Sequence, residues 1–169
     1  FTQGQATYDY RMTFVPGQGS WSYIGTDCQY VGQQYATCNI GWVAFDATLH
    51  EMMHGIGFAH EQANPNATIP WNKPVVYAEL AGPPNYWSAS TVDGNVFYRY
   101  AATSVTASIF DPVSIMQYSI KASWTLDNQG IPGGKNLSKL DRKALADSYP
   151  GRVPPVIVIP PTVTGIQLT

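Results

Sequence analysis

Residues 50–60 read HEMMHGIGFAH and contain all three histidines of this 169-residue chain. An α-helix turns about 100° and rises about 1.5 Å per residue, so His50 and His54 lie one turn apart on nearly the same face. Their imidazoles can reach one metal ion. Glu51 leans toward the same side, where a carboxylate can hydrogen-bond a metal-bound water. The spacing therefore predicts a helix that carries two metal ligands and a general base.

The third histidine requires a break in that helix. On a continuous helix His60 would lie about 9 Å beyond His54 and on a different face. Gly57 stands between them, and glycine adopts left-handed conformations at little cost, so we expect the chain to turn there and bring His60 back. Three neutral imidazoles leave the fourth tetrahedral position to water, as a hydrolytic site requires. We therefore expect one catalytic Zn²⁺ bound by His50, His54 and His60, with its water activated by Glu51.

The eleven-residue pattern H-E-x-x-H-x-x-G-x-x-H resembles the signature of the metzincin zinc endopeptidases, which is followed by a methionine turn. Residues 114–118, SIMQY, resemble that turn, and Met116 would form the apolar floor beneath the zinc ligands. Among metzincins the chain resembles the astacin family. Glu61 follows the third histidine directly, SWSYIG at 20–25 resembles an edge strand of the family, and LSKLDRKALADSYP at 137–150 resembles its last helix.

This resemblance implies an α+β fold, namely a metzincin-like zinc protease catalytic domain. A short twisted mixed sheet would pack on the active-site helix, and a C-terminal lobe of loops would precede a final helix. The chain has less sequence before the zinc helix than the family's domain, so we expect the N-terminal part of that domain to be missing. Ser20 and Trp42 stand where the family usually has a cysteine pair, and Gln117 replaces a common histidine.

The resemblance also implies roles for individual residues. Tyr118 would bind the zinc at rest and then stabilise the tetrahedral intermediate, and Glu61 would pair with the N-terminus of the mature enzyme. The substrate backbone would pair with an edge strand formed by Trp21, Ser22 and Tyr23. The implied function is a secreted zinc-dependent endopeptidase that hydrolyses peptide bonds in proteins or peptides, with an inhibitory propeptide in its precursor.

Composition limits the partners and the compartment. The formal net charge is −2, only 12% of residues are charged and no Lys/Arg cluster exists, so we expect no nucleic-acid partner. No apolar run approaches the roughly 20 residues that span a bilayer. We expect a disulfide between Cys28 and Cys38, and hence an oxidising compartment; the alternative is two free, half-buried thiols. The expected location is secreted or extracellular, or else periplasmic or at the cell surface through an appended C-terminal module.

Residues 1–150 are expected to form one catalytic domain, followed at 151–169 by a proline-rich linker or the start of another module. The active-site helix should run over about 46–58. The final helix should cover about 139–149, because Ser138 and Asp141 have the spacing of a capping box. The remaining expected elements are strands at 5–15 and 21–26, a helix from Asn72 to about 82–84, and a short helix near 87–92.

Two other functions compete with this interpretation. Glu79 lies 25 residues after His54, roughly where gluzincin peptidases place a glutamate as third ligand, but that class needs neither Gly57 nor a methionine turn. An inactive zinc-containing binding module would usually lack the base, yet Glu51 is present. The cleavage preference is not fixed by the sequence. A basic pocket lining would favour acidic substrates, and its candidates are Lys121, Lys135 and Arg142.

Overall fold

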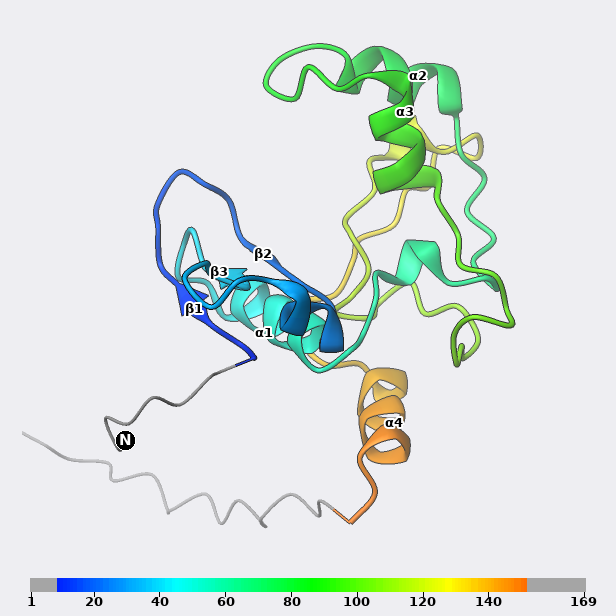
Figure 1. Ribbon diagram of the computed structural model, residues 1–169. Helices are drawn as coiled ribbons and strands as arrows, with labels where there is room; N and C mark the ends of the chain where they lie inside the picture. Colours follow the sequence, from blue (N-terminus) through cyan, green and yellow to red (C-terminus); the bar gives the residue numbers. More distant parts are fainter. Residues whose placement is uncertain (1–8, 152–169) are drawn as a thin grey trace, which may run out of the picture.

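The computed structural model describes residues 9–151 of the chain. A small sheet and helix α1 form one lobe, α2 and α3 lie at the far end of a second lobe, and α4 lies below both in this view (Figure 1). This arrangement confirms the predicted α+β fold class. The elements are β1 (Met12–Thr13), β2 (Trp21–Ser22), η1 (Gly25–Tyr30), β3 (Cys38–Asn39), α1 (Phe45–Gly55), η2 (Glu61–Ala63), α2 (Lys73–Leu80), α3 (Ala89–Val92), η3 (Asp93–Phe97), η4 (Ala122–Trp124) and α4 (Lys139–Ser148). The predicted linker lies, from residue 152 onward, outside the described residues.

The sheet is mixed, as the sequence indicated, but smaller. Its order is β1-β3-β2, with β3 parallel to β1 and antiparallel to β2, so β2 is an edge strand. Each strand has two residues, and the predictions of strands over 5–15 and 21–26 were too long where the structure describes them. The buried Asn39 explains the short ladder, because its side-chain amide donates to Val15 O and Gly19 O and accepts from Thr13 Oγ1 and Val15 N. These bonds satisfy backbone groups that would otherwise need further strand pairing.

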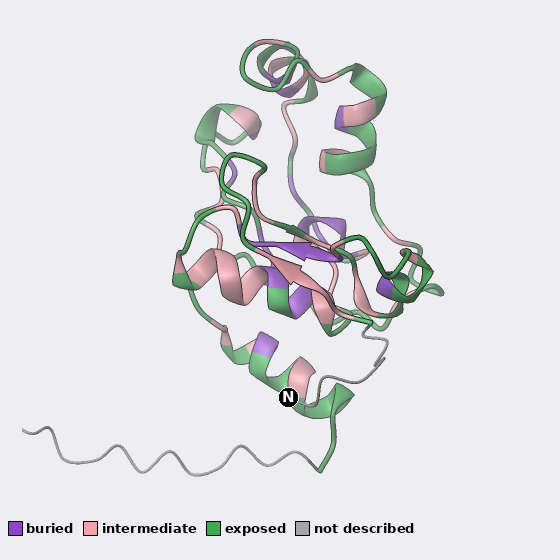
Figure 2. Ribbon diagram, turned by 60° about the vertical axis from the view of Figure 1, so that its left-hand side comes forward, coloured by how far each residue is buried: buried purple, intermediate pink, exposed green. Residues whose placement is uncertain are grey.

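Helix α1 packs between the sheet and the main apolar core, and Figure 2 shows it directly beneath the sheet. Its Met53 is 2% exposed and packs against Ile115 and Met116, with Leu49 and Phe58 beside them. On the sheet side, Gly55 lies against the ring of Tyr10. A Cβ added at Gly55 would stand 2.4 Å from Tyr10 Cε2. The helix is therefore held from both sides.

The helix ends at Gly55 rather than near Phe58, so the predicted range of 46–58 was too long. Phe58 N donates to Met53 O at 3.1 Å and Gly57 N donates to His54 O at 2.8 Å, which closes the last turn. Gly57 has φ +98°, the left-handed conformation expected of it. It packs on Gly25 of the first lobe, where an added Cβ would lie 3.0 Å from Gly57 Cα.

The second lobe contains two small apolar clusters. One joins Ala67, Ile69 and Ile120, and the other joins Val76, Leu80 and Val92 of α2 and α3. The side chains of Trp71 and Trp124 pack against both clusters and link them. This lobe forms one of the two walls of a hollow that lies between the two lobes.

Helix α4 begins with the capping box that the sequence predicts. Ser138 Oγ accepts from Asp141 N, and Asp141 Oδ2 accepts from Ser138 N at 2.8 Å. Asp141 is nevertheless 7% exposed, because its carboxylate points toward the methionine turn rather than into solvent. Leu145 of α4 packs on the cluster that contains Met53.

The predicted Cys28–Cys38 disulfide is not present, and both thiols are free and buried. Cys28 Sγ donates to Gly25 O at 2.9 Å within its own 3-10 turn. Cys38 lies in β3, and burial raises the pKa of its thiol. The two side chains therefore occupy separate surroundings, which corrects the expectation. Within residues 9–151 no helix has the length and apolar character to cross a bilayer.

Candidate active site

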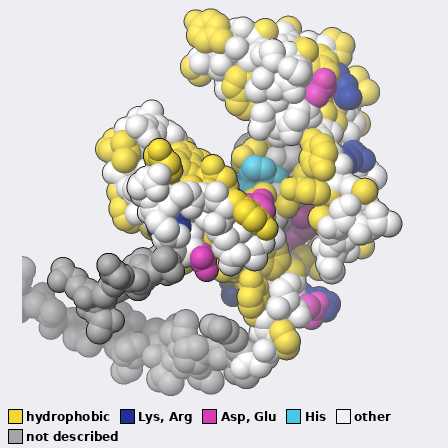
Figure 3. All heavy atoms as spheres, in the orientation of Figure 1, with side chains coloured by type: hydrophobic (Ala, Val, Ile, Leu, Met, Phe, Trp, Pro, Cys, Tyr) yellow, Lys and Arg dark blue, Asp and Glu magenta, His cyan; other side chains and the backbone are white. Residues whose placement is uncertain are grey.

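The three histidines converge at the floor of a hollow between the two lobes. Figure 3 shows the histidine side chains between the lobe of the sheet and the lobe of α2 and α3. One ligand nitrogen from each of His50, His54 and His60 can be chosen such that all lie within 4.8 Å of one another, and no other metal-binding cluster occurs in the described part of the chain. The Nε2 atoms of His54 and His60 are 3.0 Å apart.

Backbone carbonyls orient two of the rings. His50 Nδ1 lies 2.7 Å from Ile115 O, and His54 Nδ1 lies 2.7 Å from Phe58 O. A carbonyl oxygen only accepts, so each Nδ1 carries the hydrogen and each Nε2 keeps its lone pair. This is the arrangement in which metal-binding histidines are held.

The donor set fits zinc. Two nitrogens bound tetrahedrally at about 2.0–2.1 Å from one ion lie about 3.3 Å apart, close to the observed His54–His60 separation. Burial lowers the pKa of all three imidazoles, to about 4 for His54 and about 3 for His60, where the neighbouring histidines add to the effect. The imidazoles are therefore neutral near pH 7, which is the ligand form.

Glu51 lies next to the ligands on α1 and is 7% exposed. Burial raises the pKa of its carboxyl group to about 7. The Tyr10 hydroxyl donates to the backbone oxygen of Glu51 at 3.1 Å and lies 3.2 Å from Ser22 Oγ of β2. Tyr10 therefore connects the turn that carries the carboxylate to the edge strand.

The methionine turn supports the ligands from below. Met116 is 2% exposed within the apolar cluster, its carbonyl accepts from Glu61 N at 2.9 Å, and Ile115 O holds His50. The turn is itself held by Asp141, which accepts from Ser114 Oγ at 2.6 Å and from Ile115 N at 2.9 Å. A chain of contacts thus runs from α4 through the turn to a metal ligand.

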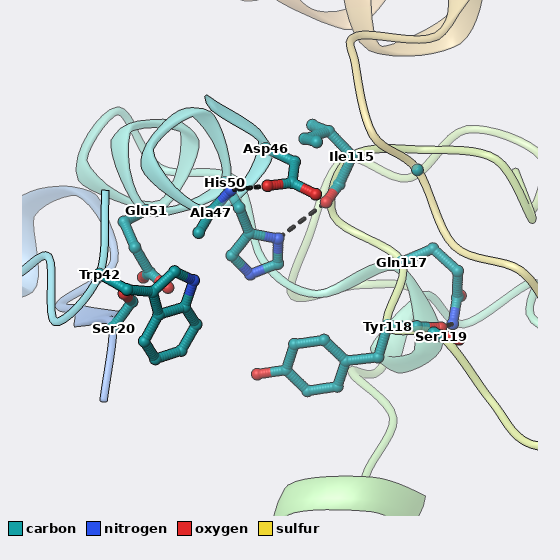
Figure 4. A pocket seen from close by; sticks show the side chains of 11 residues that line it. Ser20, Trp42, Asp46, Ala47, His50, Glu51, Ile115, Gln117, Tyr118 and Ser119 are labelled. Atoms are coloured by element: carbon teal, nitrogen blue, oxygen red, sulfur yellow. Dashed lines mark hydrogen bonds between the residues drawn. The ribbon is translucent and has the colours of Figure 1, made fainter. Parts of the chain in front are cut away.

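The ring of Tyr118 packs against two of the proposed metal ligands, His50 and His60. Its ring stacks on His50 with a centroid separation of 5.7 Å and lies 4.2 Å from the ring of His60. Burial, and next the charge of Glu51, raise the pKa of the phenol to about 12. Figure 4 shows the hydroxyl pointing into the space between His50 and Trp42. The phenol therefore stays protonated and can donate a hydrogen bond there.

Comparison with known proteins agrees with this geometry. Residues 1–73 match the model of Astacin (Peptidase family M12A). The chain superposes on a structure of myroilysin with a TM-score of 0.83 and 36% identity, covering 89% of this chain and 77% of that one. The chain belongs to the astacin family. A crystal structure of myroilysin matches with a TM-score of 0.57 and 36% identity, over 87% of this chain and 68% of that one.

A further match is Blastula protease 10 of Paracentrotus lividus. It is 38% identical over 55 residues, which make up 32% of this chain and 9% of that relative. The chain therefore matches only a small part of that relative's length.

Glu61, which follows the third histidine in this astacin-family chain, lies beside the methionine turn. Its Oε1 accepts from Asn64 Nδ2 and from Asp111 N, both at 2.9 Å, and burial raises the pKa of its carboxyl group. It borders a second cavity, which His60 also lines and Glu51 does not. Its predicted pairing with a mature N-terminus involves residues outside the described range.

The structure does not bring Glu79 to the histidines. Its carboxylate forms an ion pair with Lys121 and accepts from Trp124 Nε1 at 2.6 Å, in the second lobe. Its pKa is lowered by these partners, foremost Lys121. Glu79 is therefore a link between α2 and η4.

Sequence reasoning missed two supporting residues of this astacin-family site. Tyr10 falls within the strand predicted at 5–15, and that pattern carries no signal of its contact with Glu51. Asp141 was recognised as part of a capping box, but its bonds to Ser114 and Ile115 depend on how α4 folds back. The sequence pattern of a capping box does not show that its carboxylate also accepts hydrogen bonds from a distant segment.

Proposed function

We propose that this chain forms the catalytic core of a secreted zinc-dependent endopeptidase that hydrolyses peptide bonds in proteins or peptides. The observation that carries the proposal is the convergence of His50, His54 and His60, two of them with Nδ1 fixed by a carbonyl. Membership of a peptidase family supports the same reaction class.

His50, His54 and His60 would hold the zinc ion through their nitrogen lone pairs. When bound, zinc supplies Lewis acidity that polarises a carbonyl group and lowers the pKa of water. The Glu51 carboxylate accepts a proton from the attacking water and passes it to the departing amine. Burial raises the pKa of this carboxyl group to about 7 in the metal-free site, and the charge of a bound Zn²⁺ would lower it, which favours the carboxylate form that accepts the proton.

Tyr118 would have two roles in the reaction. Its phenol oxygen would approach the metal at rest, and its hydroxyl would donate a hydrogen bond to the oxyanion as the carbonyl carbon becomes tetrahedral. The raised pKa keeps that proton on the phenol. Met116 would keep an apolar floor under the ligands, and Gly57 would keep His60 turned toward them.

The substrate would lie along β2. In the described sheet β2 pairs with β3 on one side only, so its other edge has free backbone groups beside the site. An extended peptide can add to such an edge as a further strand. This contact would be formed by Trp21, Ser22 and Tyr23. The rings of Trp21 and Tyr23, whose centroids are 6.3 Å apart, would flank the added strand.

Family membership also supports release from the cell and synthesis as a precursor with an inhibitory propeptide. Glu61 would then receive the N-terminus freed by activation, since Glu61 and His60 line the same cavity. Detection of the processed chain in culture medium, with a new N-terminus by mass spectrometry, tests both points. An intracellular, uncut chain would contradict them.

Casein digestion with the purified zinc-loaded protein tests the reaction. The parent should cleave casein and stop when a chelator removes zinc. Glu51→Gln should bind zinc equally but cleave nothing measurable, because an amide cannot accept the proton. Glu79→Gln is the matched control, a carboxylate on another helix, and should keep both zinc and activity.

Two further variants, Glu79→Ala and His60→Ala, help to decide between the competing functions. Loss of zinc in Glu79→Ala with retention in His60→Ala would favour the gluzincin arrangement. A parent that binds zinc and peptides but cleaves none would be a binding module. Retained cleavage by Glu51→Gln would remove Glu51 as the base.

A further inference from the structure

A cavity of about 400 Å³ opens directly beside the proposed metal ligands. In Figure 4, Trp42 and Glu51 lie at one end, Gln117 and Ser119 at the other, and His50 and Tyr118 between them. Because the walls include the proposed base and one metal ligand, a substrate residue next to the scissile bond would place its side chain here. The inference therefore rests on the proposed function.

The first turn of α1 contributes a carboxylate to this cavity. Asp46 stands one helical turn before His50, and its Oδ1 accepts from Ala47 N at 2.9 Å. The ion pairs found within residues 9–151 are Lys121–Glu79 and Lys143–Asp147, so Asp46 has no cationic partner there. The cavity itself has no lysine or arginine in its walls.

A second acceptor lies in the same walls. Gln117 is 3% exposed, and its Nε2 donates to Tyr118 O at 2.8 Å. That bond fixes the amide, since only the nitrogen can face a carbonyl oxygen. Its Oε1 is then a buried acceptor without a hydrogen-bond partner in the structure. A buried acceptor without a donor is unfavourable. Since almost none of this oxygen is exposed, a ligand N–H can pair with it only after the side chain shifts toward the cavity.

The three basic residues suggested by the sequence do not counter these acceptors. None of Lys121, Lys135 and Arg142 lines the cavity, and Lys121 is paired with Glu79. The three candidates for a basic lining therefore lie elsewhere, and this cavity has none of them in its walls. The negative charge of Asp46 and the unpaired Gln117 oxygen both favour a ligand group that is positively charged and donates hydrogen bonds.

We propose that this cavity receives a lysine or arginine side chain of the substrate, adjacent to the bond that is cut, and that Asp46 and Gln117 determine this preference. A substrate lysine or arginine offers only hydrogen-bond donors at its charged end, three on the ammonium and five on the guanidinium. Their long apolar stems pass His50, Tyr118 and Trp42, while the cationic head reaches the acceptors. The substrate class is thus proteins cut beside basic residues.

Asp46 also has a plain structural explanation. A carboxylate in the first turn of a helix is stabilised by the helix dipole, whatever the substrate. That role predicts a change in stability when Asp46 is replaced, with equal effects on every peptide. Selectivity between peptides separates the two roles.

The test compares quenched fluorescent peptides that are identical except for Lys, Arg, Ala or Glu on either side of one scissile bond, with the cut located by mass spectrometry. For the zinc-loaded parent, kcat/KM at one of these two positions should be at least tenfold higher for Lys or Arg than for Glu. Asp46→Asn should reduce that ratio about tenfold, and Gln117→Leu should reduce it less. Asp127→Asn, an exposed carboxylate outside the cavity, should leave the ratio unchanged.

Cleavage with equal efficiency for Lys, Ala and Glu would overturn this inference and leave the endopeptidase proposal standing. The converse is decided by binding of the same peptides to zinc-loaded Glu51→Gln, followed by fluorescence anisotropy. Preferential binding of the Lys and Arg peptides, lost with Asp46→Asn, would support the cavity assignment even if the parent cleaved none. Equal binding of all peptides would overturn it. The parent's own profile decides the question if a cavity variant fails to fold.

Discussion

Replacing Asp141 by alanine should lower the free energy of unfolding and weaken metal binding, although Asp141 is not a metal ligand. The carboxylate accepts three hydrogen bonds, from Ser114 Oγ at 2.6 Å, Ile115 N at 2.9 Å and Ser138 N at 2.8 Å. Two of these donors belong to the methionine turn, whose Ile115 carbonyl orients His50. The substitution therefore removes the anchor of a metal ligand without touching the metal site.

The magnitude follows from those bonds. Each hydrogen bond to an ionised acceptor contributes about 1.5–3 kcal/mol, and loss of the acceptor leaves the buried Ile115 N–H and the partly buried Ser138 N–H unpaired. Entry of water and relaxation of the turn recover part of the sum. We expect the free energy of unfolding to fall by about 3–5 kcal/mol, a large share of the roughly 5–15 kcal/mol typical of a domain. Asp141→Asn keeps an oxygen for the two N–H groups and should cost less than half as much.

Urea unfolding followed by circular dichroism, on metal-free and zinc-loaded protein, measures this effect. The control is Asp147→Ala on the same helix, whose exposed ion pair with Lys143 contributes less than about 0.5 kcal/mol. Zinc affinity of Asp141→Ala should fall at least tenfold, and that of Asp147→Ala should not change. Equal stability of the two alanine variants would refute the reasoning, as would unchanged zinc affinity in Asp141→Ala.

Tyr118→Phe should lower kcat by about 10²–10³ with a smaller change in KM and with zinc retained, because the oxyanion loses a hydrogen-bond donor; steady-state kinetics at the parental rate would reduce Tyr118 to a packing role. The metal-free protein should lose stability as pH falls below about 6.5, because the unfolded chain takes up protons before His54 and His60, whose pKa values are lowered to about 4 and about 3. Glu51, whose pKa is raised to about 7 in the folded chain, takes up its proton first in the folded state and offsets part of this loss. Urea unfolding across pH 7 to 4 checks this, and a flat profile contradicts it. Gly55→Ala should destabilise by about 1–3 kcal/mol despite alanine's better helix propensity, since its Cβ would overlap the Tyr10 ring; a gain in thermal midpoint would disprove the close contact.

The active-site helix and its turn could be predicted because their causes are local. The spacing of His50 and His54 follows from helix geometry, and Gly57 supplies the positive φ that brings His60 back. The capping box of α4 is equally local, since both partners lie within one turn. Such features depend on neighbours in sequence, and a single chain reveals them.

The remaining features depend on contacts between distant segments. The sheet is short because Asn39 satisfies the loop that ends at Gly19, and no alternation of apolar residues reports that bond. The spacing of Cys28 and Cys38 suggested a bridge, but a 3-10 turn directs Cys28 to Gly25 instead. The acceptors Asp46 and Gln117 meet in one cavity only after α1 packs on the methionine turn.

The hydrogen bond between His50 and Ile115 joins residues 65 positions apart, which has a consequence for synthesis on the ribosome. All three histidines leave the ribosome well before the carbonyl that orients the first of them. A nascent chain can therefore carry the whole H-E-x-x-H-x-x-G-x-x-H segment without a fixed metal centre. The orientation of His50 is complete only after Ile115 has been made and has packed against helix α1. Under the proposed function, the ability to cut peptides would thus be postponed until the chain is no longer an unfolded target for its own activity.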